Sequence, residues 1–153
     1  MSEWIQLLAA FLGSMAFAIL FHIRGVKLLA AAFGGGLSWG LFLLLNRVVE
    51  KEAICYFIVA VLISFYAEIM ARCLKAPVTV FVSPCLIPLV PGASLYYAMS
   101  YALGGGFAQG FERALHTLAL GSALAVGVIV SAVIMKLITG LRHAKKEKKH
   151  ERI

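Results

Sequence analysis

Residues 76–111 read APVTVFVSPCLIPLVPGASLYYAMSYALGGGFAQGF, and no side chain in this stretch is charged. As one helix the stretch would be about 54 Å long, against an apolar bilayer core of about 30 Å, so we expect it to bend or break. Three prolines stand at i, i+4 and i+7, and the last is followed by glycine (Pro84, Pro88, Pro91 and Gly92). Each proline removes a backbone donor, and freed backbone groups survive in lipid only beside protein or a watery cavity. A break at membrane depth therefore indicates a path for a polar solute.

Composition places the rest of the chain in the same class. Apolar residues make up 62% of the 153 residues and charged residues only 14%, which leaves too little polar surface for a soluble globular domain. The sequence therefore predicts an all-α, polytopic membrane protein. The chain has room for about five spans of about 20 residues each.

Charged residues interrupt the apolar sequence and mark the ends of the expected spans. These spans cover residues 4–22, 28–46, 53–72, 78–103 and 114–138. The fourth is broken at a Pro-x-x-Pro-Gly motif, with a re-entrant hairpin as the rival geometry. A glycine turn (Gly104 to Gly106) and an external loop to Arg113 are expected after it. Residues 1–140 would then form one transmembrane domain, and residues 141–153 a basic cytoplasmic tail.

Lysine and arginine placement tests this topology. With an odd number of spans and the tail inside, the N-terminus lies outside, and the count is eleven basic residues inside against three outside. Four or six spans would put either the tail or the loop with Arg24 and Lys27 on the wrong side. The formal charge of +7 thus orients the protein against anionic lipid and does not indicate nucleic-acid binding.

Catalytic and cofactor chemistry is not expected. The chain has no aspartate, and of its glutamates only Glu68 lies within a span, so paired carboxylates for acid/base work are missing. Its three cysteines and four histidines show no metal-ligand spacing, and the glycine triplets fit neither the dinucleotide nor the phosphate-loop pattern. We therefore predict no enzyme, no metal and no cofactor.

Glu68 is the single acidic residue expected inside the membrane. An ionisable group there is costly unless it pairs or faces water, and is by default a functional candidate. Arg72 follows four residues later, in the favourable order for a helical ion pair. Two interpretations stay open: a structural ion pair near the cytoplasmic end, or a gate or proton-coupling group.

Small residues recur at four-residue intervals in the second and fifth spans. This spacing lets transmembrane backbones approach closely, so we expect these faces to pack against other helices; a pore lining is the alternative. The residues concerned are Gly36, Gly40, Gly121, Ala125, Gly127 and Ser131.

Residues 86–101, LIPLVPGASLYYAMSY, carry a family resemblance. The Pro-x-x-Pro-Gly motif followed by a tyrosine-bearing helix resembles the small subunit of split threonine/serine exporters, as in the bacterial two-component pair that exports succinate. The resemblance runs from the third to the fifth span and includes Arg72, Pro88, Pro91, Gly92 and Arg113. Spans one and two are similar only in character.

The resemblance implies a secondary transporter in the bacterial plasma membrane. It implies a larger partner subunit with a soluble N-terminal domain and five spans of its own. It also implies that the proton gradient drives transport. A half-helix starting after Pro91 and Gly92 would aim backbone N–H groups at a substrate carboxylate. Further candidate residues for binding or gating are Ser94, Tyr96 and Tyr97, although the tyrosines also suit an interfacial aromatic belt.

Two other classes remain as alternatives. The first is a homo-oligomeric channel or noncatalytic membrane assembly made of copies of this chain alone. The second is a membrane enzyme that depends on His116 or Glu68. The sequence does not choose between threonine, serine and a dicarboxylate such as succinate as the small polar solute.

Overall fold

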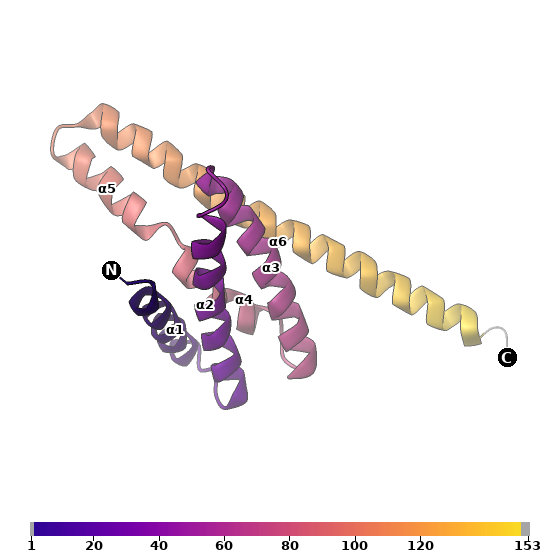
Figure 1. Cartoon of the computed structure of the whole chain (residues 1–153). Helices are drawn as coiled ribbons and strands as arrows, with labels where there is room; N and C mark the ends of the chain where they lie inside the picture. The colour runs from indigo at the N-terminus through magenta and orange to yellow at the C-terminus, as the bar shows by residue number, and fades with distance from the viewer. Residues whose placement is uncertain (1, 151–153) are drawn as a thin grey trace.

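The computed structural model describes residues 2–150, with side chains described as far as residue 139. Its elements in chain order are α1 (Glu3–Leu20), α2 (Val26–Leu45), α3 (Glu52–Cys73), α4 (Thr79–Leu86), a 3-10 turn η1 (Ile87–Leu89), α5 (Gly92–Leu103) and α6 (Phe107–His150) (Figure 1). Four of these helices, α1, α2, α3 and α6, are long and apolar enough to cross a membrane. The pair α4–η1 and α5, bent by 50°, stands where the broken fourth span was predicted. The all-α membrane fold is thus confirmed.

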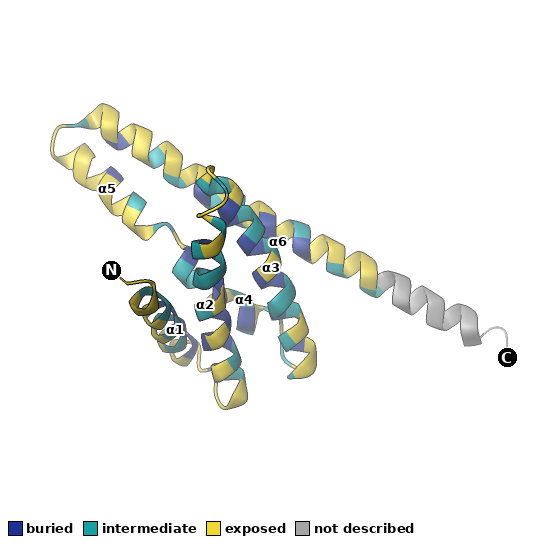
Figure 2. Ribbon diagram, in the orientation of Figure 1, coloured by how far each residue is buried: buried dark blue, intermediate teal, exposed yellow. Residues whose placement is uncertain are grey.

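Helix α2 lies at the centre of a bundle formed by α1, α2, α3 and α4 (Figures 1 and 2). The core beside it is built from fully buried apolar side chains of α3, α4 and η1, among them Ile63, Phe81 and Leu89. Tyr66 Oη donates to the backbone oxygen of Ala30 at 2.8 Å and so ties α3 to α2. The contacts within the chain therefore join α2, α3, α4 and η1 in one core.

Small residues set how closely the helices approach, as predicted, and their partners are helices of the same chain. A Cβ added at Gly40 would lie 3.2 Å from Leu7 of α1, and one at Gly127 would lie 2.8 Å from Ala60 of α3. The tightest approach is at Gly35, where an added Cβ would lie 1.8 Å from Ser14 Oγ of α1. The sequence did not indicate this contact. A Cβ at Gly121 would meet nothing within 4 Å.

Helices α3 and α6 run in the same direction. His116 Nε2 lies 3.5 Å from a carboxylate oxygen of Glu52 at one end, and Arg72 donates to Thr139 Oγ1 at 2.9 Å at the other. Two successive long helices can be parallel only if the chain between them returns along the molecule. The bent pair α4–η1–α5 provides that return (Figure 1).

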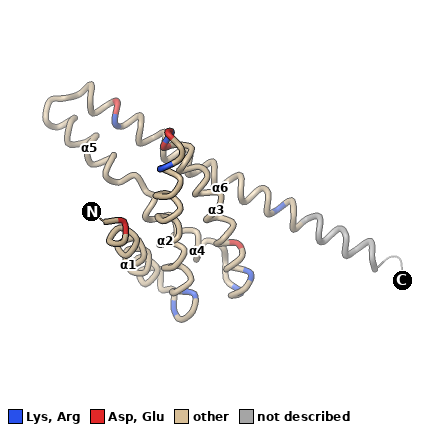
Figure 3. Tube along the Cα trace, viewed as in Figure 1, with Lys and Arg blue, Asp and Glu red and all other residues tan. Residues whose placement is uncertain are grey.

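Charged residues of the bundle lie at its two ends (Figure 3). Glu3 and Arg47 form an ion pair at the end where α1 begins and α2 stops. The opposite end holds the connections from α1 to α2 and from α3 to α4, and in or beside them lie Arg24, Lys27, Arg72 and Lys75. The basic residues expected in the tail, 141–153, lie outside the residues whose side chains are described.

The prediction that an external loop runs to Arg113 is wrong. The chain turns within three glycines, and α6 begins at Phe107. Gly105 has φ +85°, and the Gly106 N–H donates to the Tyr101 oxygen at 2.9 Å, which closes α5 in the manner of a Schellman cap. A Cβ at Gly110 would lie 2.9 Å from the Ala98 oxygen, so the early turns of α6 gain close packing on α5 that a loop would lack.

We call α5 together with residues 107–118 of α6 the arm. It extends away from the bundle, and α5 makes its main contacts with α6 (Figures 1 and 2). Within α5 the buried residue is Ala98. Large apolar side chains of the arm are exposed: Leu95, Tyr96, Tyr97, Met99, Tyr101, Leu103, Phe107, Phe111, Leu115 and Leu118.

Candidate functional site

The break in the fourth element is a tight turn centred on Pro91. Val90 leaves the 3-10 turn with extended backbone, ψ 122°, and Pro91 has φ −75° and ψ 56°. The Gly92 N–H donates to the Val90 oxygen at 2.7 Å, which makes Val90 to Gly92 an inverse γ-turn. Proline is suited to the centre of this turn because its ring fixes φ near this value and it needs no N–H there.

Helix α5 begins directly after this turn with free donors. Its first backbone bond runs from the Leu95 N–H to the Pro91 oxygen at 3.2 Å, and no side chain caps the helix. The N–H groups of Ala93 and Ser94 lie in the first turn, where a helix offers them no acceptor. The partial positive charge of a helix N-terminus adds to them, so this point of the chain favours an anionic group.

A cavity of about 240 Å³ lies beside the break. Its lining residues come from α1, α2 and η1: Gln6, Ala9, Ala10, Trp39 and Pro88. Trp39 Nε1 donates to Gln6 Oε1 at 3.2 Å, which joins α1 to α2 at this wall. Of the predicted site residues, only Pro88 lines this cavity. Sequence reasoning missed Gln6 and Trp39, although a single amide within the apolar first span was a signal that could have identified the former.

The predicted tyrosines lie elsewhere. Tyr96 and Tyr97 are on α5, are 68% and 53% exposed, and pack edge to face with ring centroids 5.7 Å apart. Ser94 is half-buried near the start of the same helix. The arm therefore carries these side chains away from the lining of the cavity at Pro88.

Glu68 and Arg72 meet, but not at the break. Arg72 Nη2 lies 3.6 Å from Glu68 Oε2, and the Glu68 side chain is 18% exposed. The pair occupies the last turns of α3, and neither residue lines the cavity beside Pro88. Within the part of the chain that the structure describes, no group of three histidine, cysteine or glutamate side chains could hold a metal ion.

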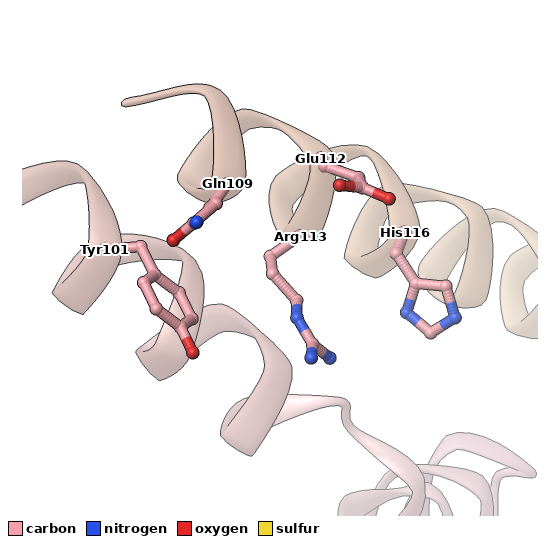
Figure 4. A pocket seen from close by; sticks show the side chains of 5 residues that line it. All are labelled: Tyr101, Gln109, Glu112, Arg113 and His116. Carbon is pink, nitrogen blue, oxygen red and sulfur yellow. The ribbon is translucent and has the colours of Figure 1, made fainter. Parts of the chain in front are cut away.

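A second cavity, of about 380 Å³, lies in the arm between α5 and α6. It is lined by Tyr101, Gln109, Glu112, Arg113 and His116 (Figure 4). Sequence reasoning placed Arg113 in a loop and so did not see that helix α6 brings these polar side chains together.

Comparison with protein families gives one match. A family model described as Threonine/Serine exporter, ThrE, matches residues 6–134 of the chain. No curated protein and no solved structure matches. The matched range includes both cavities and the break, and it extends the similarity to the first two helices.

Proposed function

This chain belongs to the threonine/serine exporter family, and we propose that it forms one membrane half of a secondary exporter of small amino or carboxylic acids. The observation that carries the proposal is the turn at Pro91. It leaves backbone donors unpaired at the start of α5, inside the charge-free residues 76–111. A carboxylate is the substrate group that such donors recognise, as at discontinuous helices of other transporters.

The parallel course of α3 and α6 supports a kinked fourth span over a re-entrant hairpin. If both helices cross the bilayer in one direction, an odd number of crossings must separate them. A hairpin that returned to its own side would instead make α6 antiparallel to α3. The chain would then have five spans, with the ends of α1 and α2 that hold Glu3 and Arg47 outside.

We propose that the exposed arm packs against a larger subunit with its own five spans. A break with unpaired backbone donors is tolerated at membrane depth only where protein or water covers it. In this chain α5 rests mainly on α6, so its other faces are open to a partner. A partner half in the inverted orientation would complete the site from the opposite side.

Glu68 is the candidate for proton coupling. It is an acidic side chain inside the candidate span Glu52–Cys73, and its pair with Arg72 gives it two states, paired or protonated and released. Threonine, serine and a dicarboxylate such as succinate are all within the proposed substrate class.

The test is counterflow of labelled threonine and succinate in vesicles that contain this chain and its larger subunit. Pro91→Ala restores a backbone donor at the turn, and we expect transport to fall by about tenfold or more, a change of about 1.4 kcal/mol in the barrier. Pro77→Ala is the matched control, because Pro77 precedes α4 and lies outside the break. Normal transport by Pro91→Ala at normal expression would refute the assignment of the break.

Glu68→Gln separates coupling from structure in the same vesicles. A coupling role predicts that counterflow continues while proton-driven accumulation is lost. A purely structural ion pair predicts equal effects on both. Mild-detergent purification of the chain tests the partner: a co-eluting larger subunit supports the split exporter, whereas a homo-oligomer that conducts ions alone favours the channel alternative.

A further inference from the structure

The cavity in the arm, between α5 and α6, has no role in the function proposed so far. At about 380 Å³ it falls within the range of small-molecule sites, about 300–1,000 Å³. Its lining is polar, which is unusual in a chain whose exposed surface is otherwise largely apolar. Tyr101 comes from the end of α5, and the remaining side chains come from the first turns of α6.

Arg113 is the permanently charged basic group in the lining of this cavity. Arg113 and His116 are three residues apart and extend from the same side of α6 (Figure 4). His116 Nε2 lies 3.5 Å from a carboxylate oxygen of Glu52 of α3, so this part of α6 faces the bundle. Among the described residues, Arg113 has no carboxylate within ion-pair distance, so its guanidinium is available to a ligand.

A guanidinium without an ion-pair partner favours an anionic ligand. Its planar fork matches a carboxylate with two parallel hydrogen bonds, which is stronger than a single neutral bond. The Tyr101 hydroxyl and the Gln109 amide lie on the same cavity and can bond a further polar group of the ligand. Glu112 also lines the cavity, but it is adjacent to Arg113 in sequence and extends from a different side of α6 (Figure 4).

We infer that this cavity is a second substrate site, which binds a carboxylate of the exported solute through the guanidinium of Arg113. The inference rests on the proposed export function and adds a second binding site to it. Tyr101 and Gln109 line the same cavity and would bond the hydroxyl or ammonium group of a small amino acid.

The position of the cavity indicates on which side of the membrane the site lies. His116 joins Glu52 at the end of the bundle where Glu3 and Arg47 also lie, and that end is external in the five-span topology. The solute would then bind first in the cavity at the break and next in the cavity at Arg113, from which it is released outside. Substitutions at Arg113 should alter the affinity for solute on the external side and leave the affinity on the internal side unchanged.

The experiment measures counterflow of labelled threonine in vesicles containing both subunits, with unlabelled threonine varied on one side at a time. Arg113→Gln is expected to raise the external half-saturation concentration by about tenfold or more, because one charge-assisted carboxylate contact is lost. The internal value is expected to stay within about twofold. Arg113→Lys keeps the positive charge but not the planar guanidinium. Its external half-saturation concentration should fall between those of the wild type and Arg113→Gln.

Arg47→Gln is the matched control, since Arg47 lies at the same end but outside the cavity, and it should leave both half-saturation values unchanged.

The outcomes are distinguishable. If wild-type protein shows counterflow and Arg113→Gln leaves the external value unchanged, or raises both values equally, the inference is wrong and the proposed function stands. If wild-type protein transports none of threonine, serine and succinate, both are wrong. Thermal stabilisation of the purified full chain by threonine, but not by threonine methyl ester, is a second readout; equal stabilisation by both would also overturn the inference.

Discussion

The bundle and the arm differ in how much of their structure this chain explains. In the bundle, Ile63, Phe81 and Leu89 are fully buried, and each helix has partners within the chain. In the arm, Leu103 is 86% exposed and α5 rests mainly on α6. Apolar exposure is ordinary beside lipid, where it costs little. The two regions differ in their polar features, because the break and the Arg113 cavity lie where few other helices of the chain pack around them. We expect the bundle to be the scaffold and the arm to be the part completed by a partner.

A pair of leucine truncations gives the largest contrast between the two regions. Leu89 is fully buried in η1, whereas Leu95, six residues later, is 52% exposed on α5. Leu89→Ala should lower the free energy of unfolding by about 2 kcal/mol or more, because it leaves a cavity among packed side chains. Leu95→Ala should change it by less than about 0.5 kcal/mol.

Thermal unfolding of the isolated chain in one detergent measures both variants. Equal destabilisation would show that α5 packs within the chain as tightly as η1 does, and the division into bundle and arm would fail. If Leu95→Ala instead weakens only co-purification of the larger subunit, the arm is the partner surface.

Two glycines of α6 sharpen the boundary between the regions. A Cβ at Gly127 would lie 2.8 Å from both Ala60 Cβ and the Phe57 oxygen of α3, whereas one at Gly121 would meet nothing within 4 Å. Gly127→Leu should therefore push α6 off the bundle and cost about 1–3 kcal/mol through overpacking. Gly121→Leu, the matched control, should be neutral or slightly stabilising, because leucine favours a helix more than glycine does.

The same thermal assay, with the fraction of monodisperse protein as a second measure, distinguishes the two substitutions. A tolerated Gly127→Leu would mean that α6 does not approach α3 as closely as the structure has it.

The fold was predictable from the sequence because length and lack of charge restrict what a bilayer accepts. Charge-free stretches bounded by Arg24, Arg47 and Arg72 identify helices, and Pro88 with Pro91 identifies the break. Residues 107–113 were misread because glycine and the absence of charge were taken as signs of a loop. What makes them helical is packing on Ala98 and Ala102, a contact between α5 and α6 that a single sequence does not display.

The candidate sites were less predictable. The turn at Pro91 follows from local chemistry, so its residues were found. The cavity walls join residues far apart in sequence, as Gln6 with Trp39 and Tyr101 with Arg113. Such pairs depend on helix rotation and tilt, which periodicity cannot give in spans that are apolar on every side.

The smallest expected contrast lies within the bundle, between two arginine ion pairs. Arg47 and Glu3 are 60% and 53% exposed, so water screens their attraction and the pair should contribute less than about 1 kcal/mol. Arg72 pairs with a Glu68 side chain that is only 18% exposed, and it also donates to Thr139 of α6 at 2.9 Å. Arg72→Gln should therefore lower thermal stability more than Arg47→Gln does, because it leaves a half-buried carboxylate unpaired and removes a bond that fastens α6 to α3. High salt should reduce the effect of Arg47→Gln and largely spare that of Arg72→Gln. The reverse order would mean that the Arg72–Thr139 bond adds little to the attachment of α6 to the bundle, and that the end of α3 is free to serve the coupling role proposed for Glu68.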